Sequence, residues 1–289
     1  MSTPRVFDAR MVPRIRECLG SWTPPNTIKP HERYLDLYRM RERTIPIDIE
    51  DQIAQMRAAG VQRAIICAAD NTTTWGRKTP NEVIGKLCER YPNVFIGLAG
   101  ADPHKGMEAV REFEYAVTSL GLRGLNLGPW LHKLLPNDKR YYPLYAKSIE
   151  LNVPVVLAMS SHFDPTTTFE TGNPTYLDEV CGFFPDLKVV ASHAGWPWIL
   201  QMVAVAWRHP NVYLELSGIR PRYLHRDLVA YFDTPILKGR VLFATDYPLL
   251  EWSVCIDDLL RLPIAEETKR EILWDNAARL FNLDGQPPS

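Results

Sequence analysis

The chain has 289 residues, a length that suits one α/β barrel as well as two smaller domains. Its 33 Lys and Arg residues nearly balance 34 Asp and Glu residues, so a net charge of −1 offers no general attraction to nucleic acid or to an anionic membrane. No apolar run approaches the roughly 20 residues of a membrane span, and the start, MSTPRVFDAR, lacks the apolar segment of a secretory signal. We therefore expect a cytoplasmic protein that binds neither nucleic acid nor membrane.

The cysteines do not form a metal or disulfide pattern. There are five of them, they are scattered, and none follows C-x-x-C spacing: Cys18, Cys67, Cys88, Cys181 and Cys255. An odd, dispersed set argues against a disulfide framework and against a structural zinc site. We expect Cys67 and Cys255 to pack as small apolar residues.

Eight short segments have the composition of buried strands. Most are continuous apolar runs, as expected of strands that are covered on both faces. They are Arg5–Asp8, Arg63–Cys67, Val94–Ala99, Gly121–Leu127, Val153–Leu157, Leu187–Ser192, Asn211–Leu216 and Arg240–Thr245.

Helical patterns lie between these segments. They are Ile49–Ala59, Pro80–Arg90, Gly106–Ser119, Tyr142–Leu151, Tyr176–Phe184, Trp198–Arg208, Arg222–Phe232 and Thr268–Phe281. Eight strand-then-helix units predict an α/β fold, a single (β/α)8 TIM barrel over residues 1–284. Residues 285–289, GQPPS, are expected to form a flexible tail. No G-x-G-x-x-G or Walker loop follows a strand, which removes the common nucleotide-binding motifs.

One connection departs from this regular spacing. Residues 9–47 join the first strand to its helix and contain Trp22, several prolines and a run of charged residues. A connection this long in a barrel is usually functional and would emerge at the active-site face. We interpret it either as a lid or as an arm that contacts another subunit.

Two strands end in polar residues that suit catalysis. The run Leu187–Trp198, LKVVASHAGWPW, places His193 where a buried strand gives way to a loop, and Arg240–Pro248, RVLFATDYP, places Asp246 in the same way. The carboxyl ends of parallel barrel strands meet at a shared mouth. We therefore expect His193 and Asp246 to lie together there.

The strand-end motifs, in order along nearly the whole chain, resemble those of the amidohydrolase-related family of TIM barrels, which includes aminocarboxymuconate-semialdehyde decarboxylase-like enzymes. The matching pieces are SLGLRGLNLGPW, RYYPLYAKSIELNVPVVL, PTYLDEVCGFFPDLKVVASHAGWPW, HPNVYLELSG, VLFATDYPL and ILWDNAARLFNL. This resemblance implies metal-assisted attack on a carbonyl group, or decarboxylation.

The chain departs from the family's metal-binding pattern. Most members end their first strand with D-x-H-x-H, whereas the corresponding alternation here reads Asp8, Arg10, Val12. Ala158 stands where relatives place another histidine, and Asn126 stands where many have a lysine. The resemblance thus leaves a degenerate metal site.

A metal remains one alternative. Catalytic zinc takes three protein ligands and a water, and His162 could join His193 and Asp246 to hold a single zinc or iron ion. The competing interpretation of His162 is a loop residue bonded to backbone or water.

A site without a metal is the other alternative. Arg10 would place a permanent guanidinium where relatives place a cation, able to bind a carboxylate or stabilise an oxyanion. Asp246 would then act as general base and His193 would orient it and move the proton. The purely structural interpretation is that Arg10 forms a buried ion pair with Asp8 or Asp246.

Further residues are candidates for contact with substrate. They are Asp8, Asn126, Trp130, His162 and Trp196. The two tryptophans could line a pocket for an aromatic substrate, or equally pack within the core or against another subunit.

Two functional hypotheses follow. The chain is either a divergent hydrolase or decarboxylase of a small carboxylated or lactone-like substrate, which we favour, or a catalytically silent barrel. In the second case it would assemble with a metal-complete relative that carries a hydrolytic or di-metal oxygenase activity. Either way we expect a small-molecule substrate and a homo- or hetero-oligomer with a related barrel.

Overall fold

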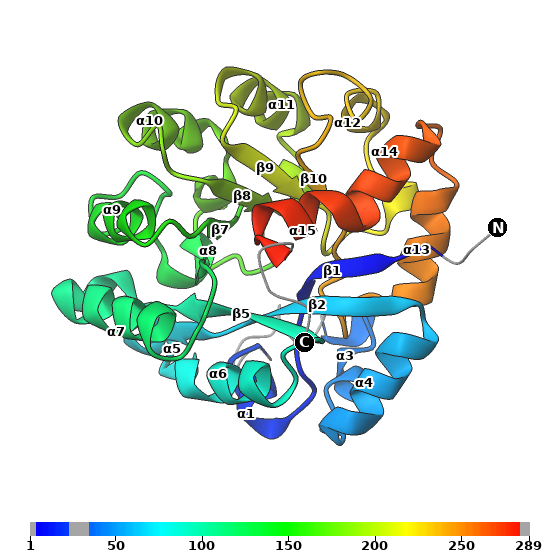
Figure 1. Cartoon of the computed structure of the whole chain (residues 1–289). Helices are drawn as coiled ribbons and strands as arrows, with labels where there is room; N and C mark the ends of the chain where they lie inside the picture. The colour runs from blue at the N-terminus through cyan, green and yellow to red at the C-terminus, as the bar shows by residue number, and fades with distance from the viewer. Residues whose placement is uncertain (1–3, 23–34, 284–289) are drawn as a thin grey trace.

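Eight parallel strands form a ring in the computed structural model, which describes residues 4–22 and 35–283. Each strand pairs with its neighbour in the order β1-β2-β5-β6-β7-β8-β9-β10. The strands are β1 (Val6–Met11), β2 (Val61–Cys67), β5 (Phe95–Gly100), β6 (Leu125–Leu127), β7 (Val155–Ala158), β8 (Val189–Ser192), β9 (Val212–Glu215) and β10 (Val241–Leu242). The predicted (β/α)8 barrel is confirmed, and Figure 1 shows the helices arranged around the strands.

The ring closes between the first strand and the segment that follows the last one. Met11 forms a parallel bridge with Tyr247, and the backbone N–H of Ala9 donates to the carbonyl of Phe243 at 2.8 Å. Closure removes the open edges that a flat sheet would expose. It also brings the end of β1 beside the loop that carries Asp246.

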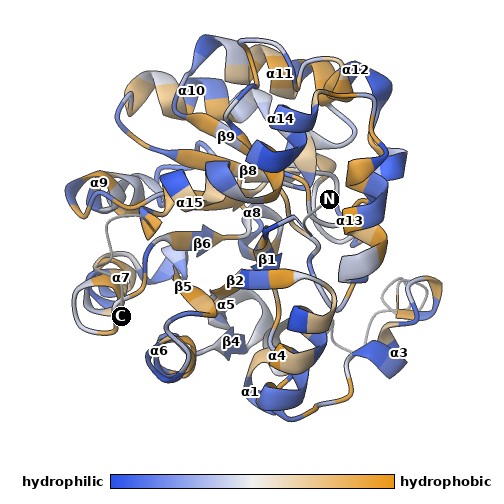
Figure 2. Cartoon of the chain, turned by 45° about the vertical axis from the view of Figure 1, so that its right-hand side comes forward, coloured by the Kyte–Doolittle hydropathy of each residue, from blue (hydrophilic) through white to orange (hydrophobic). Residues whose placement is uncertain are grey.

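Helices cover the outside of the ring. The main ones are α4 (Ile49–Ala58), α6 (Asn81–Arg90), α7 (Met107–Thr118), α9 (Tyr142–Glu150), α10 (Thr175–Phe183), α11 (Ile199–Arg208), α12 (Arg226–Val229) and α13 (Trp252–Leu260). Figure 2 shows both apolar and polar residues on these helices, as expected of elements with one buried face. None of the helices in the described ranges is long and apolar enough to cross a membrane.

The C-terminal helical segment covers the amino ends of the strands. It consists of α14 (Glu266–Arg270), a π-helical turn (Glu271–Asp275) and α15 (Asn276–Leu280). Trp274, Ala277 and Phe281 join one apolar cluster with the barrel-interior residues Phe7 and Leu242. With this end filled, the carboxyl ends of the strands are left to form the site.

Several smaller elements were not predicted. They are α13, the hairpin of β3 (Ala69–Asn71) and β4 (Arg77–Thr79), and the short helices α1 (Arg16–Trp22), α3 (Met40–Arg43), α5 (Thr72–Trp75) and α8 (Pro129–His132). The helix predicted at Arg222–Phe232 is shorter, because a 3-10 turn at Pro221–Tyr223 precedes α12. Short helices give too few residues for a periodic pattern.

The connection at 9–47 is partly helical rather than a plain loop. Leu35 and Met40 pack against Leu249, and the Arg43 guanidinium donates to the carbonyls of Pro248 and Leu249. This part of the connection thus covers the loop that follows β10. Residues 23–34, with the predicted proline-rich stretch, and the tail 285–289 lie outside the described residues, and the choice between lid and subunit arm stays a prediction.

Candidate active site

Arg10 enters the barrel mouth at a break in strand register. The pairing of β1 with β2 shifts between Asp8 and Met11, so the strict alternation of side chains ends there. Phe7 and Ala9 pack in the barrel interior, and Arg10 reaches residues at the ends of β6, β8 and β9. The prediction that Arg10 points into the mouth agrees with this geometry.

Three residues hold the Arg10 guanidinium. Its Nε donates to Glu215 Oε2 at 3.1 Å, and its Nη2 donates to Asn126 Oδ1 at 3.2 Å and to Ser192 Oγ at 2.9 Å. Asn126 is itself anchored, because its amide nitrogen donates to the carbonyl of Ala68. Within the described part of the chain, Nη1 of Arg10 has no hydrogen-bond partner.

Asp8 does not share the mouth with Arg10, contrary to our expectation. Its carboxylate is fully buried and accepts hydrogen bonds from Thr245 and from the indole of Trp252 on α13. Burial raises the pKa of Asp8 to about 7, against the lowering effect of its hydrogen-bond donors. The register shift explains the error, since the alternation that put Asp8 and Arg10 on one face does not continue through it. Asp8 therefore links β1 to α13, and its buried carboxylate is not accessible to substrate.

His193 lies in a tight turn directly after β8. His193 and Ala194 both have positive φ, at 62° and 54°. The ring nitrogen Nδ1 is 2.8 Å from Ser217 Oγ and 3.2 Å from the Ser217 carbonyl oxygen. Since a carbonyl only accepts, a proton on Nδ1 satisfies this contact and leaves the lone pair on Nε2.

Gly218 permits this close approach. A Cβ atom at that position would lie 3.0 Å from Nδ1 of His193, and the residue has a φ of +76°. Glycine adopts such a conformation without the strain that a side chain would add. The imidazole orientation thus depends on backbone after β9 as well as on β8.

Asp246 occupies the corresponding position after β10. Its backbone N–H donates to the carbonyl of Arg10 at 2.9 Å, and its φ is +58°. No hydrogen bond or ion pair joins its carboxylate to a residue within 4–22 or 35–283. Burial raises the pKa of Asp246, while the charges of His193 and Arg10 lower it and that of Glu215 raises it. The charge of His193 thus acts on the Asp246 carboxylate, and the joint catalytic role of the two residues stays a prediction.

Glu215 is the site residue that we did not predict. It is 1% exposed and forms an ion pair with Arg10, where we had considered Asp8 or Asp246 as the partner. Its second oxygen accepts the backbone N–H of Ser217 at 2.7 Å. The signal was present in LELSG, where a carboxylate interrupts an apolar strand.

Cys67 also reaches this region. The predicted apolar role holds in part, because Cys67 packs against the interior cluster. Burial raises the pKa of its thiol to about 11, although the nearby charge of Arg10 lowers it. The thiol therefore stays protonated near neutral pH.

The other predicted contacts lie farther out. The ring of Trp130 stacks on that of His162 with centroids 3.2 Å apart and an interplanar angle of 13°, and Phe163 packs beside both. Trp130 belongs to α8, which follows β6, and His162 and Phe163 come from the loop after β7. Trp196 follows the turn that carries His193 and is 51% exposed, and its contact with substrate stays a prediction.

The three-residue metal set that we considered is not assembled. Nδ1 of His162 accepts the backbone N–H of Asp164 at 2.9 Å, while the ring stacks on Trp130. Across residues 4–22 and 35–283, no group of three or more His, Cys, Asp or Glu side chains is placed to hold a metal ion. His193 and Asp246 thus lack the predicted third ligand.

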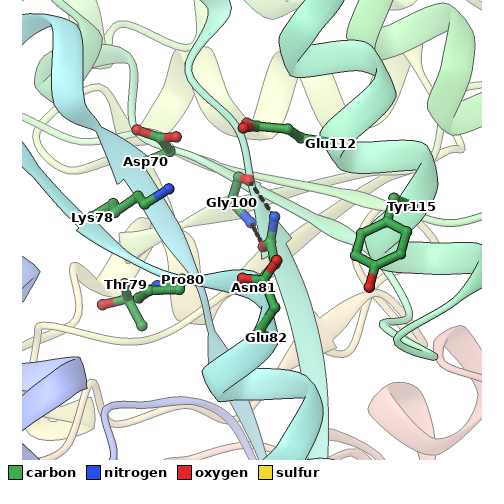
Figure 3. A pocket seen from close by; sticks show the side chains of 9 residues that line it. All are labelled: Asp70, Lys78, Thr79, Pro80, Asn81, Glu82, Gly100, Glu112 and Tyr115. Carbon is green, nitrogen blue, oxygen red and sulfur yellow. Dashed lines mark hydrogen bonds between the residues drawn. The ribbon is translucent and has the colours of Figure 1, made fainter.

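A separate polar pocket lies beside α6 and α7 (Figure 3). Asn81 is bonded in both directions to the backbone of Gly100, and Asp70 pairs with Lys105 at 2.6 Å. These polar groups are already matched within the protein, and the pocket includes no residue of the mouth. The barrel mouth is therefore the better candidate site.

A family model described as amidohydrolase matches residues 6–283. Among curated proteins, the chain is 23% identical over 301 residues to a gamma-resorcylate decarboxylase of Polaromonas sp. strain JS666, covering 87% of this chain and 89% of that one. The sequence matches therefore agree with the barrel fold of the structure.

Solved structures share the fold. An uncharacterized TIM-barrel protein, Bb4693 of Bordetella bronchiseptica, superposes with a TM-score of 0.80 at 26% identity, over 98% of this chain and 100% of that one. A dihydroxybenzoic acid decarboxylase from Polaromonas sp. JS666, solved with manganese and the inhibitor 2-nitroresorcinol, gives a TM-score of 0.71 at 20% identity, over 99% of this chain and 98% of that one.

Proposed function

Because this chain belongs to the amidohydrolase family, we propose that it is an enzyme that decarboxylates a small carboxylated substrate at the barrel mouth. Several curated relatives are gamma-resorcylate decarboxylases, and solved neighbours include decarboxylases of 5-carboxyvanillate and 2,6-dihydroxybenzoate, whereas another curated relative is a hydratase. Such acids carry an oxygen in conjugation with the carbon that loses carbon dioxide. This substrate class suits a site that combines a fixed cation with a proton donor.

The observation that carries the proposal is a set of three polar groups at the barrel mouth that have no hydrogen-bond partner within the described ranges. They are Nη1 of Arg10, Nε2 of His193 and the carboxylate of Asp246, none of which has a hydrogen-bond partner in the described ranges. None of these atoms is among the fully enclosed unpartnered atoms of the described ranges, so each is open to water or to a ligand. Such groups are concentrated at functional sites, where a ligand completes them. A silent scaffold would have no use for them.

The raised pKa of Asp246 favours decarboxylation over hydrolysis. A carboxyl group whose pKa is raised keeps its proton to a higher pH than an ordinary aspartate does, which favours a role as an acid. Hydrolysis would require Asp246 to accept a proton from water, whereas decarboxylation requires a proton to be donated to carbon. Lactone hydrolysis is therefore the second candidate.

The reaction can be written with these groups alone. Asp246 donates its proton to the ring carbon that bears the carboxylate, and a neighbouring phenolate becomes a ketone. The bond to the carboxylate then breaks, carbon dioxide leaves, and its electron pair restores the aromatic ring and the phenolate. Nη1 of Arg10 donates to the oxygen on which this negative charge develops. His193 Nε2 then takes a proton from water and passes it to the Asp246 carboxylate, which resets the site, and the hydroxide that remains leaves to solvent.

The residues at the mouth do not fit the manganese that solved decarboxylases hold. Two possible ligands, His193 and Asp246, are fewer than a catalytic metal usually takes, and no set of three exists in the described part of the chain. Arg10 brings a positive charge to the same space. No step above uses a metal.

Incubation of the purified chain with 2,6-dihydroxybenzoate or 5-carboxyvanillate tests the proposal. We expect release of carbon dioxide and formation of the decarboxylated phenol, detected by chromatography, at a rate that Asp246→Asn lowers by about 100-fold or more. Absence of turnover by the chain alone, with turnover on co-expression of a metal-binding relative, would instead establish the silent-subunit alternative.

A further inference from the structure

We propose that the Arg10 guanidinium, fixed by Glu215, is the resident cation of this barrel mouth and takes the place of a divalent metal. The inference rests on the proposed function for the reaction that the cation serves. Its evidence does not depend on the reaction, because it concerns the contacts that hold the Arg10 guanidinium and the ions that the mouth can bind.

Four strands hold this cation. Arg10 comes from the end of β1, Asn126 from β6, Ser192 from β8 and Glu215 from β9. Contacts at Nε and Nη2 fix the plane of the guanidinium, and Asn126 is itself anchored to the carbonyl of Ala68, directly after β2. A group held this way is preorganised, so only the Nη1 edge is left to bind an anion.

The same contacts use the oxygen atoms that a metal would need. One Glu215 oxygen accepts from Arg10 and the other from the backbone of Ser217. The oxygens of Asn126 and Ser192 accept from Nη2. A divalent ion would therefore have to displace the guanidinium or sit beside a like charge.

Glu215 also reaches the imidazole indirectly. Its Oε1 accepts the Ser217 N–H at 2.7 Å, and the hydroxyl of Ser217 lies 2.8 Å from His193 Nδ1. One carboxylate at the end of β9 therefore orients the cation and supports the residue that orients the proton carrier. We assign Glu215 as a positioning residue, since it has no free edge to touch substrate.

Metal binding provides the first test. Titration of the whole chain with manganese chloride alone, followed by calorimetry and by metal analysis after desalting, should give no stoichiometric binding. Stoichiometric manganese that Asp246→Asn releases would overturn the inference.

A designed variant tests whether the Arg10 guanidinium is what prevents metal binding. Ala158 at the end of β7 pairs with Ser192, which contacts Arg10, so a side chain at position 158 starts beside the cation. Arg10→His combined with Ala158→His should gain at least 100-fold in manganese affinity over the parent chain. Failure to gain affinity would mean that the guanidinium is not what excludes the metal, and the inference would fall.

Ligand binding in excess EDTA tests the positive role of the cation. The Arg10→Gln/Glu215→Gln variant removes both members of the ion pair and leaves no unpaired charge. Its affinity for 2,6-dihydroxybenzoate should fall about tenfold or more, while its weaker affinity for neutral resorcinol stays unchanged. Equal loss for both ligands, or loss of parent binding in EDTA, would contradict the inference.

Glu215→Gln separates positioning from charge. Without Glu215 the guanidinium keeps its charge and turns more freely, so kcat should fall about tenfold while KM does not rise. A fall in kcat together with a rise in KM, in proportion to a lower melting temperature, would indicate a merely structural role. An absence of turnover in the parent chain would refute the proposed function and leave the metal and ligand-binding results to decide the inference.

Discussion

The Ser217 hydroxyl lies 2.8 Å from Nδ1 of His193, and the carbonyl of the same serine lies 3.2 Å from that nitrogen. Two oxygen atoms of one residue therefore fix one side of the imidazole. The opposite nitrogen is left as the only ring atom that can exchange protons with the mouth. This arrangement explains how a histidine without a carboxylate partner can hold one orientation.

Asp246→Asn should abolish turnover without unfolding the barrel. The amide has nearly the same shape and cannot donate an acidic proton, so the rate should drop by about 100-fold or more. The melting temperature should stay equal or rise, because a buried carboxylate without a hydrogen-bond partner in the described ranges is removed. Steady-state kinetics and calorimetry measure the two quantities. A variant with near-normal turnover would exclude Asp246 as the proton donor.

The rate should fall as the pH rises. Burial raises the pKa of Asp246 in the folded protein, and the reaction uses the protonated form. Activity is thus expected below that pKa and is lost as the pH passes through it. A profile of kcat/KM against pH checks this, and a rate that instead increases with pH through the acidic range would favour hydrolysis with Asp246 as the base.

Gly218→Ala should disturb the imidazole. The new Cβ would lie 3.0 Å from Nδ1 of His193, and its φ of +76° adds strain of about 1–2 kcal/mol. Gly121→Ala is a matched control, because Gly121 has a φ of +70° and nothing within 4 Å of the added atom. Both variants should lose similar unfolding free energy, but only Gly218→Ala should lose activity. Equal activity in the two would mean that the His193 orientation is not critical.

Asp8 should make stability depend on pH. Its pKa is about 7 in the folded chain, raised by burial from an ordinary value near 3.8. A raised carboxyl pKa contributes stability that is fully present below pH about 4 and is lost as the pH rises to about 7, a change on the order of 4 kcal/mol.

Urea denaturation at several pH values, with Asp8→Asn beside the parent chain, measures this contribution. The variant should be less stable at acidic pH, since an amide nitrogen cannot accept the Trp252 and Thr245 donors. Its unfolding free energy should also change less between pH 4 and 7. Parallel pH profiles for the two proteins would exclude Asp8 as the cause.

The sequence predicted the barrel and part of its site because both depend on local patterns. Continuous apolar runs marked all eight strands. Polar residues directly after such runs identified His193 and Asp246, since the end of a parallel strand has a fixed place in a barrel. Arg10 was identified from the family resemblance instead, because it stands where relatives place a metal-binding histidine at the end of the first strand.

The rest of the site depends on pairing between distant strands. The register shift in β1 turns Asp8 away from Arg10, and no local pattern reveals such a shift. Glu215 was not predicted, because its pairing with Arg10 joins distant strands, although a carboxylate in an apolar strand could have suggested a buried partner. His162 was considered as a ligand because its loop geometry could not be read from spacing.

Barrel closure has a consequence for biosynthesis. The ribosome makes β1 before the other strands, and Arg10 lacks its charged partner until Glu215 has left the exit tunnel, and the segment of Asp246 follows later. A nascent chain that ends before Asp246 carries the cation but not the proton donor, so it is chemically inert. The proposed catalytic pair is therefore assembled only when the barrel closes.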